Sequence, residues 1–269
     1  MNTAEFQATI WEYYQAHGRH DLPWRVTDSA DRLDPYHVLV SELMLQQTQV
    51  PRVIPKYELF LHKFPSLQAL AQAELGAVLQ AWSGLGYNRR AKYLWQATTM
   101  IVSEYDGIFP TTEDCLVDLP GVGKNTAGAI LAYAFNQPVV YIETNIRSVF
   151  LHHFFAGQDG VTDGEVVQLV AKTLDTEHPR EWYWALMDYG AFLKKSVSNP
   201  GKRSATYTRQ SQFQGSRRQI RGQVLRYLTS TQASLETLQH AISDERLESV
   251  LDELAREGMI YLGNDQYHL

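Results

Sequence analysis

The sequence predicts an all-α fold that ends in a small module of different pattern. Apolar residues recur at helical spacing along most of the chain, and convincing alternating strands are absent until the extreme C-terminus. A Gly-x-Gly turn also joins two helical patterns near the middle. The chain has 269 residues, of which 44% are hydrophobic and 12% aromatic. This composition excludes a disordered chain, and the length predicts two or three lobes.

The helices follow from apolar spacing and from their start signals. Phe6, Ile10, Tyr13 and Tyr14 predict a first helix over Phe6–Ala16. Asp34-Pro35 starts the next helix, which continues through HVLVSELMLQQ toward Pro51, because proline suits a first turn. Ser66 and Thr112 have the sequence context of N-caps. Further amphipathic helices are expected over Asn88–Glu104, Asp163–Glu177 and Arg180–Lys195.

The C-terminal region changes character after a stretch with the composition of a linker, Ser196–Ser216. Beyond it, QIRGQVLRYLTS, LETLQHAIS and ERLESVLDELAREGM predict three short helices. MIYLGNDQYHL predicts a hairpin that turns at Gly263-Asn264-Asp265. Three helices and a hairpin over residues 217–269 are the outline of a winged helix. Such a module contacts DNA or another protein, and a small structural cap is the alternative.

Charge is distributed very unevenly. The net charge is −6, yet nine basic residues and no acidic residue lie between Lys194 and Arg226, which leaves 15 basic residues against 30 acidic ones elsewhere. A positive strip on an acidic body is typical of a face that binds a polyanion. A solvated linker is the alternative. In the first helix of the C-terminal module, Arg217, Arg218 and Arg221 are the candidate phosphate ligands.

Several classes of protein are excluded at this stage. No stretch approaches the roughly 20 apolar residues of a membrane helix, and the N-terminus lacks the basic and apolar segments of a signal peptide. One cysteine, Cys115, excludes an internal disulfide and a thiolate-held zinc or iron–sulfur site. We therefore expect a cytoplasmic protein, monomeric and without a membrane partner.

The sharpest motif is Leu-Pro-Gly-Val-Gly-Lys-Asn-Thr-Ala, which starts at Leu119. It lies between two helical patterns, Thr112–Val117 and Lys124–Phe135. Gly121 and Gly123 permit backbone conformations that a Cβ forbids, and the N–H groups at the next helix start can bind a phosphate oxygen. Lys124 adds a positive charge, and Asn125 follows it in the first turn. The motif predicts a helix–hairpin–helix, a DNA clamp that is independent of base sequence.

The chain resembles the helix–hairpin–helix DNA glycosylases over roughly residues 5–195, most closely the adenine glycosylase branch known as MutY. The strings that carry the resemblance are LPWR from Leu22, PY from Pro35, SELMLQQTQV from Ser41, WSGLGY from Trp82, LPGVGKNTAGAIL from Leu119, ETNIR from Glu143 and MDYGA from Met187. The resemblance implies a two-lobed fold whose lobes are residues 28–140 and residues 1–27 with 141–213. It also implies that a base is flipped out of the duplex and excised.

Glu42 is the candidate catalytic acid. It lies in an apolar helix beside Leu39, Leu43 and Met44, and burial there raises the pKa of a carboxyl, so that it can hold a proton near neutral pH. The resemblance implies that this group protonates the adenine ring. A salt-bridged or capping glutamate is the alternative. The resemblance further implies that Gln46 and Gln47 enter the base stack or touch the opposite base, and that Tyr87 is the intercalating tyrosine. A core tyrosine is the alternative for Tyr87.

Glu143 is the candidate second carboxylate, which would stabilise the positive charge growing on the sugar. The family has aspartate at this position, so Glu143 is a departure by one methylene, about one ångström of reach. An inert glutamate at a helix N-terminus is the alternative. Asn145 and Arg147 match polar positions of the family on the same helix and are candidates for binding the phosphate beside the flipped sugar.

Three further departures refine the expectation. Bifunctional relatives form a Schiff base through a lysine that would lie at position 125, and Asn125 cannot do so. Relatives with a four-iron cluster have four cysteines after the MDYGA helix, whereas this chain has none there, so no cofactor is expected and the chain resembles branches that lack the cluster. The lesion-reading domain of the family is replaced by the C-terminal module. By resemblance, the carbonyls of Val117, Leu119 and Val122 are a candidate site for a monovalent cation.

The leading hypothesis is a monofunctional DNA glycosylase that removes a mispaired base, adenine first, from double-stranded DNA. A glycosylase for mismatched thymine or uracil is one alternative. A non-catalytic protein that binds DNA lesions is the other.

Overall fold

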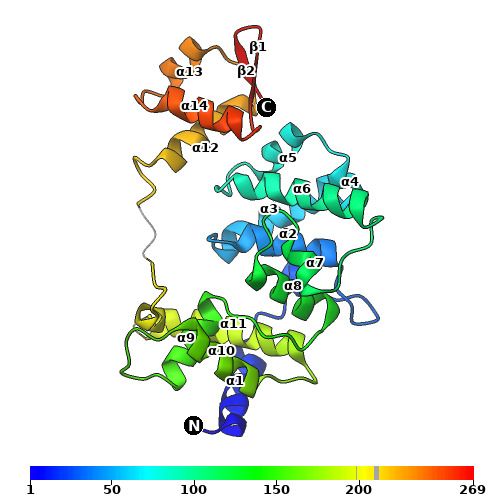
Figure 1. Cartoon of the computed structure of the whole chain (residues 1–269), viewed down its shortest axis with the longest axis vertical. Helices are drawn as coiled ribbons and strands as arrows, with labels where there is room; N and C mark the ends of the chain where they lie inside the picture. The colour runs from blue at the N-terminus through cyan, green and yellow to red at the C-terminus, as the bar shows by residue number, and fades with distance from the viewer. Residues whose placement is uncertain (198, 209–211) are drawn as a thin grey trace. The chain divides into compact units, whose positions relative to one another are not determined.

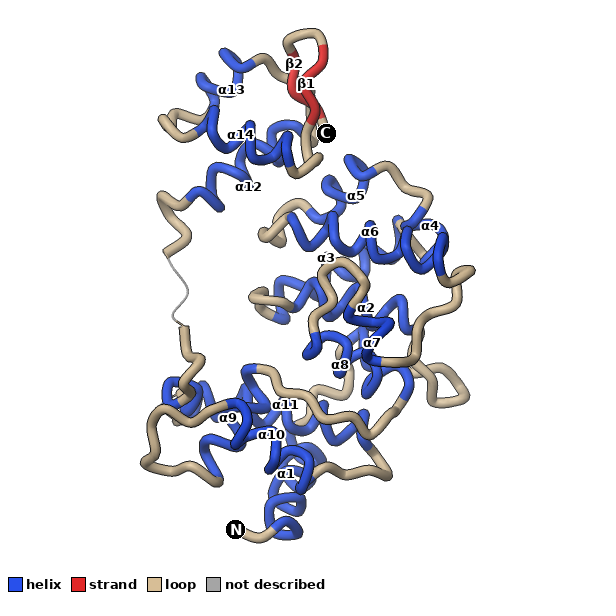
Figure 2. Tube along the Cα trace, viewed as in Figure 1, coloured by secondary structure: helices blue, strands red, loops and turns tan. Residues whose placement is uncertain are grey.

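The computed structural model describes residues 1–197, 199–208 and 212–269, and nearly all of its regular structure is helical (Figures 1 and 2). Contacts divide the chain into two compact units. The first unit comprises residues 1–38, 111–118 and 122–209, and the second comprises 39–110, 119–121 and 210–269. Among the described residues, no helix is both long and apolar enough to cross a membrane.

The first unit contains helices from both halves of the sequence. They are α1 (Thr3–His17), η1 (Pro23–Arg25), α7 (Glu113–Val117), α8 (Lys124–Phe135), α9 (Thr144–His153), α10 (Asp163–Thr173), α11 (Pro179–Ser196) and η2 (Pro200–Arg203). Helix α11 packs on α1, α8 and α9. The centre of this core is aromatic, with the ring of Phe6 5.1 Å from that of Phe150 and 6.0 Å from that of Trp182.

Helices α9 and α11 approach each other unusually closely at Gly190. A Cβ added there would lie 2.3 Å from the carbonyl oxygen of Asn145. Because real Cβ atoms do not come that close to a backbone oxygen, only glycine fits between the two helices. This approach sets the position of the first turn of α9.

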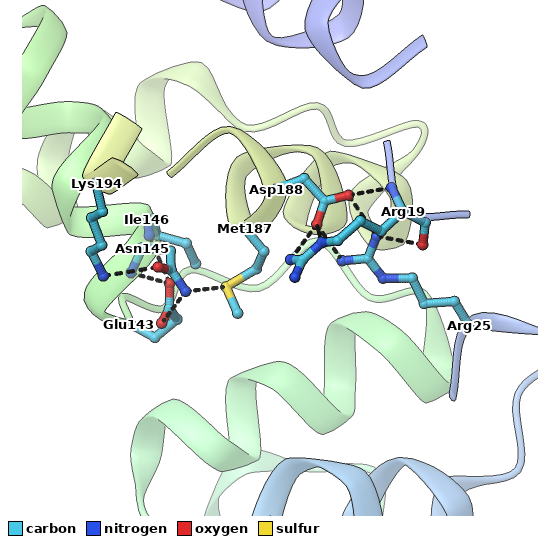
Figure 3. A network of polar contacts seen from close by, with 8 residues as sticks. All are labelled: Arg19, Arg25, Glu143, Asn145, Ile146, Met187, Asp188 and Lys194. Carbon is cyan, nitrogen blue, oxygen red and sulfur yellow. Dashed lines mark hydrogen bonds and ion pairs between the residues drawn. The ribbon is translucent and has the colours of Figure 1, made fainter. Parts of the chain in front are cut away.

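A buried ion-pair cluster ties α11 to the N-terminal segment. The carboxylate of Asp188, 3% exposed, accepts two hydrogen bonds of 2.9 Å from Arg25 and one of 2.7 Å from the backbone N–H of Arg19 (Figure 3). Burial by itself raises the pKa of Asp188, but the hydrogen bonds and charges of Arg25 and Arg19 outweigh it, so the pKa lies below its usual range. The cluster is structural, since the carboxylate is fully occupied.

The second unit contains α3 (Val50–Lys63), α4 (Leu67–Ala71), α5 (Leu75–Trp82), α6 (Arg89–Glu104) and the C-terminal module. The chain enters it through α2 (Pro35–Leu45). Helix α6 packs on α4 and α5, and α3 packs on α5. The C-terminal module has α12 (Arg217–Leu228), α13 (Leu235–Ala241), α14 (Leu247–Arg256) and the antiparallel strands β1 (Tyr261–Gly263) and β2 (Gln266–His268).

The elements of the C-terminal module follow the sequence closely. Helix α14 buries Val250, Leu251 and Leu254, and it packs on α12. Asn264 and Asp265 both have left-handed φ values, 51° and 58°, as a tight hairpin turn requires. The predicted three helices and hairpin are therefore confirmed as elements, while the assignment to winged helices stays a prediction.

Most predicted helices are confirmed, and two expectations are wrong in extent. The helix expected over Asp163–Glu177 ends at Thr173, because the carboxylate of Asp175 accepts the N–H groups of Glu177 and His178 in a separate turn. The helix expected from Pro35 toward Pro51 ends at Leu45, and α3 starts after a break. Ser66 caps α4 through its side chain, whereas Thr112 is at the N-cap of α7 without a side-chain cap bond.

The two units do not coincide with the lobes predicted from the sequence, 28–140 and 1–27 with 141–213. Helix α8, predicted to share a lobe with Glu42, belongs to the same unit as α9 and α11. The residues of the C-terminal module, 217–269, belong to the second unit. Arg209, one of the nine basic residues of the positive strip, is outside the described residues. The domain boundaries stay predictions.

Candidate nucleic-acid interface and active site

The predicted hairpin motif has the expected local structure. Helix α7 ends at Val117, and α8 begins at Lys124 with Gly123 as its N-cap. Gly121 has φ +79°, and a Cβ there would lie 2.7 Å from the Cβ of Tyr93, so no other residue fits. Gly123, Lys124 and Asn125 are exposed at the start of this twelve-residue helix. The N-terminus of α8 thus offers N–H groups and a lysine to an anion, as predicted.

The candidate carbonyl site for a monovalent cation lies in the same segment. Val117 is the last residue of α7, and Val122 comes directly before Gly123. In the described part of the chain, none of the carbonyls of Val117, Leu119 and Val122 accepts a backbone hydrogen bond outside the helices. Backbone carbonyl oxygens are the type of ligand that a hard cation takes. The site itself stays a prediction.

Glu42 has the apolar setting that the sequence predicts. It is half-buried on α2, and Leu39, Leu43 and Met44 beside it are each 0% exposed. The backbone continues regularly past it, since its carbonyl accepts the N–H of Gln46 at 3.3 Å. Glu42 lies in the second unit and Glu143 in the first.

The candidate stack-inserting residues Gln47 and Tyr87 share an unusual backbone. Seven described non-glycine residues have positive φ, and five of them are Asp or Asn, which tolerate this region. The other two are Gln47, with φ 54°, and Tyr87, with φ 50°. Residues in this conformation cost of order 1–3 kcal/mol and persist where the surroundings fix them, typically at functional sites. The two loops that end α2 and precede α6 are therefore held in a specific shape.

One buried side chain, that of Arg90, holds both loops. Its guanidinium donates to the carbonyls of Leu43, Met44 and Gln46 at 2.6, 2.9 and 2.5 Å on one side. On the other side it donates to the carbonyl of Gly86 at 3.1 Å. Arg90 also lies over the rings of Trp82 and Tyr87, with its guanidinium carbon 5.4 Å from each centroid. Burial lowers the pKa of Arg90 to about 10.

A groove of about 1090 Å³ lies between these loops and α12, all within the second unit. Gln46, Gln47 and Tyr87 line one part of it. Its arginines are Arg52, Arg89, Arg90, Arg217, Arg218, Arg221 and Arg226, and Glu253 is the one carboxylate among its lining residues. A groove with this composition suits a polyanion.

The three arginines predicted as phosphate ligands differ in their engagement. Arg217 pairs with Glu253 at 2.6 Å, and Arg221 pairs with Glu257 at 2.5 Å. The guanidinium of Arg218 instead covers the ring of Tyr87 and donates to its hydroxyl. The charges of Arg217 and Arg221 are thus already compensated by residues of α14 and of the turn after it, far along the chain.

Glu143 is the N-cap of α9 in the first unit. One carboxylate oxygen, Oε1, accepts the backbone N–H groups of Asn145 and of Ile146, the latter at 2.7 Å. The other, Oε2, accepts the side-chain amide of Asn145 at 3.3 Å (Figure 3). The alternative of a helix-capping glutamate is therefore realised in the geometry. Capping and catalysis are compatible, because the cap fixes an anion at the positive end of the helix.

The protonation of Glu143 depends on opposing effects. Burial raises the pKa of Glu143, whereas the hydrogen bond from the N–H of Ile146, the charge of Lys194 and the N–H of Asn145 lower it, and the pKa remains above its usual value. Lys194 donates to the Oδ1 of Asn145 at 2.8 Å (Figure 3). Arg147 donates from Nε and Nη2 to Asp163 at 2.8 and 2.7 Å, so the charge of the predicted phosphate ligand is already paired.

Sequence reasoning missed Arg90 and Lys194 as members of the sites. Both stand in pairs of like residues, Arg89-Arg90 and Lys194-Lys195, and only burial separates the two members of each pair. The helical register was the available signal, since the inward member lies on the apolar face of α6 or α11.

The fold and these sites define a class of DNA-repair protein built on the helix–hairpin–helix. Residues 40–174 match the HhH-GPD superfamily, described as base excision DNA repair proteins. The chain is also 34% identical over 266 residues to the adenine DNA glycosylase of Mycolicibacterium smegmatis, covering 91% of this chain and 89% of that protein. The chain belongs to the HhH-GPD superfamily.

Other relatives cover less of their own length. The adenine DNA glycosylase of Buchnera aphidicola subsp. Baizongia pistaciae is 35% identical over 197 residues, which is 72% of this chain and 54% of that protein. The chain thus spans about half the length of this relative. A solved structure of a thermostable thymine-DNA glycosylase superimposes with a TM-score of 0.63 at 23% identity, over 74% of this chain and 90% of that one. This last similarity concerns the fold.

Proposed function

We propose that the chain is a monofunctional DNA glycosylase that removes adenine from a mismatch in double-stranded DNA. The observation that carries the proposal is the fixed carboxylate of Glu143 at the N-terminus of α9, within a chain similar to adenine DNA glycosylases over nearly its whole length. The strained loops at Gln47 and Tyr87 support base flipping, because a wedge must replace the extruded base.

The reaction divides between two carboxyl groups. Glu42 gives its proton to the adenine ring, which makes the base a better leaving group as the bond from nitrogen to the sugar C1′ breaks. The ionised Glu143 stabilises the positive charge that develops on the sugar. Water adds to C1′ and gives up a proton to the carboxylate that Glu42 has become, so that the products are free adenine and an abasic sugar and Glu42 is again protonated.

We expect water, and not an amine, to attack the sugar. Asn125 has no nucleophilic amine, and Lys124 lies on the exposed first turn of α8, where phosphate is its expected partner. Borohydride should therefore trap no covalent protein–DNA adduct during turnover. Efficient trapping that disappears in Lys124→Ala would contradict this assignment.

The proposed protein needs no iron–sulfur cluster and acts as a monomer in the cytoplasm. The sequence has one cysteine, whereas a four-iron cluster takes four ligands. Stoichiometric iron and broad visible absorption in the purified protein would overturn the first expectation, and a dimer in sedimentation analysis would overturn the second.

A single-turnover assay across defined mismatches tests the proposal. We expect fastest base release from duplexes with a mispaired adenine, with the base opposite it varied as part of the panel. Preferred release of thymine or uracil would assign a different substrate. Tight binding to mismatches without release of any base would identify a non-catalytic lesion-binding protein.

A further inference from the structure

We propose that Lys194 is a positioning residue for the candidate catalytic site: it fixes the side-chain amide of Asn145, and it supplies the positive charge that balances the carboxylate of Glu143. This inference rests on the proposed function for its catalytic meaning. Its structural part concerns only α9 and α11 of the first unit (Figure 3).

The hydrogen bonds run in one direction through Asn145. The ammonium of Lys194 can only donate, and it donates to the Oδ1 of Asn145 at 2.8 Å. An ionised Glu143 can only accept, and it accepts from the Nδ2 of Asn145 at 3.3 Å. A lysine at one end and a carboxylate at the other therefore permit one orientation of the amide. Without Lys194, the amide could turn its oxygen toward Glu143 and repel the carboxylate.

Among the described basic residues near Glu143, Lys194 differs from Arg147 because it is not held in an ion pair by another acidic residue. Arg147 on α9 is held by Asp163 on α10 at 2.7 Å. On η2, Arg203 donates to the carbonyl of Leu151, and Lys202 is exposed. Lys194 forms no direct ion pair within the described ranges, and its hydrogen-bonded link to Glu143 passes through Asn145.

The charges of Lys194 and Glu143 each oppose the pKa shift that burial causes in the other residue. Burial lowers the pKa of Lys194, and the charge of Glu143 opposes that shift. Burial raises the pKa of Glu143, and the charge of Lys194 opposes it in turn. Removing the lysine charge therefore raises the pKa of Glu143 further. A carboxylate that must be ionised to stabilise the sugar cation then becomes active only at higher pH.

The test compares Lys194→Met with Lys195→Met, which removes the same charge from the neighbouring, exposed position of α11. Single-turnover base release is measured from pH 5 to 9. In Lys194→Met, we expect the rate of base release at the acid end to be about tenfold lower than on the alkaline plateau of the same variant. The acid limb of its pH profile should lie at higher pH than in the wild type. Lys194→Arg should restore the acid limb, and Lys195→Met should keep the wild-type profile.

A second readout does not depend on activity. The carboxyl carbon of Glu143 is titrated by NMR in protein labelled at glutamate, with Glu143→Gln to assign the signal. We expect its midpoint to rise in Lys194→Met and to stay unchanged in Lys195→Met. An unchanged midpoint, or weaker DNA binding with an unmoved pH profile, would overturn the inference and make Lys194 a phosphate contact.

The two proposals fail separately. If the wild type releases no base but the NMR midpoint shifts in Lys194→Met, the proposed function is wrong and the positioning of Glu143 by Lys194 stands. If the wild type is active, and Lys194→Met changes neither the pH profile of base release nor the NMR midpoint of Glu143, the positioning role is wrong and the glycosylase function stands.

Discussion

The guanidinium carbon of Arg218 lies 5.3 Å from the centre of the Tyr87 ring, and the same group donates a hydrogen bond to the Tyr87 hydroxyl. The C-terminal module thus covers one face of the ring that we propose enters the base stack. Either the arginine leaves the ring when DNA binds, or it moves with the ring to the phosphates beside the wedge. Arg217, one position earlier on α12, is instead paired with Glu253 at 2.6 Å.

This difference predicts the salt dependence of DNA binding. Arg218→Met should reduce the slope of log affinity against log salt by about 0.9, the value for one phosphate contact. Arg217→Met should change the slope much less, because the charge of Arg217 is already paired with Glu253 at 2.6 Å. Fluorescence anisotropy at several salt concentrations gives both slopes. Equal slopes for Arg218→Met and the wild type would show that Arg218 does not contact a DNA phosphate.

Substitution of Arg90 should separate folding from base flipping. Arg90→Lys keeps a charge but cannot bridge Gln46 and Gly86 at once, so we expect base release to fall about a hundredfold, the cost of misplacement by an ångström. Arg90→Met should also lower the free energy of unfolding by about 3 kcal/mol, because buried carbonyls lose their donor.

The measurement for Arg90 is 2-aminopurine fluorescence beside the mismatch, which reports unstacking. Arg180→Lys is the matched control, since Arg180 is also buried and donates to the carbonyls of Tyr133 and Asp31, at 2.6 and 2.8 Å, in the other unit. A normal fluorescence response in Arg90→Lys would show that the loops keep their shape without the bridge.

Glu42→Gln should abolish base release and leave mismatch binding nearly unchanged. The amide has the same shape as the acid but no proton to give, and it replaces a half-buried group among apolar neighbours. Single-turnover kinetics and a binding titration on the same duplex check both parts. Retained release would remove Glu42 from the role of acid.

Glu143→Asp should reduce base release by an order of magnitude or more, although it introduces the residue of the family. The shorter side chain can still cap α9, but its carboxylate would lie about one ångström away from the position that the longer side chain reaches, and rates are sensitive at that scale. Glu143→Gln should abolish release. Wild-type rates in Glu143→Gln would exclude Glu143 as the stabilising charge.

The pH dependence of stability should reflect His153. Burial lowers the pKa of His153 to about 4, and its ring accepts or donates one hydrogen bond with the Tyr189 hydroxyl at 3.1 Å. Below the ordinary pKa near 6.5, the unfolded chain takes up a proton that the folded chain does not. The free energy of unfolding should therefore fall as the pH is lowered from about 6.5 to about 4.

Urea unfolding at several pH values checks this expectation. His153→Gln should reduce in part the dependence of the free energy of unfolding on pH. The dependence that remains is expected to come from His152, because burial also lowers the pKa of His152. The exposed His62 serves as the control through His62→Gln. An unchanged slope in His153→Gln would show that this histidine takes up its proton in the folded chain.

Local patterns predicted the elements well, and long-range contacts account for what they missed. Helix α8 begins at Lys124 and ends at Phe135 as predicted, because glycine and the apolar face mark both the start and the register. The role of Arg90 was not predictable, since its partners at Gln46 and Gly86 come from different segments. The pairing of Arg217 with Glu253 likewise depends on packing of α12 against α14.

For the same reason, the sequence indicated Glu143 as an anion but not its hydrogen bonds. The capping of α9 is local and could be expected from a carboxylate at a helix start. The contribution of Lys194 comes from 51 positions further along the chain, because α11 returns beside α9.

The close approach at Gly190 limits how this protein can change during evolution. The proposed catalytic carboxylate, that of Glu143, is one methylene longer than the aspartate that the resemblance implies at this position. A single methyl group at position 190 cannot be accommodated in this structure, because it would clash with the backbone oxygen of Asn145. A position that contributes no atom to the proposed chemistry therefore accepts only glycine.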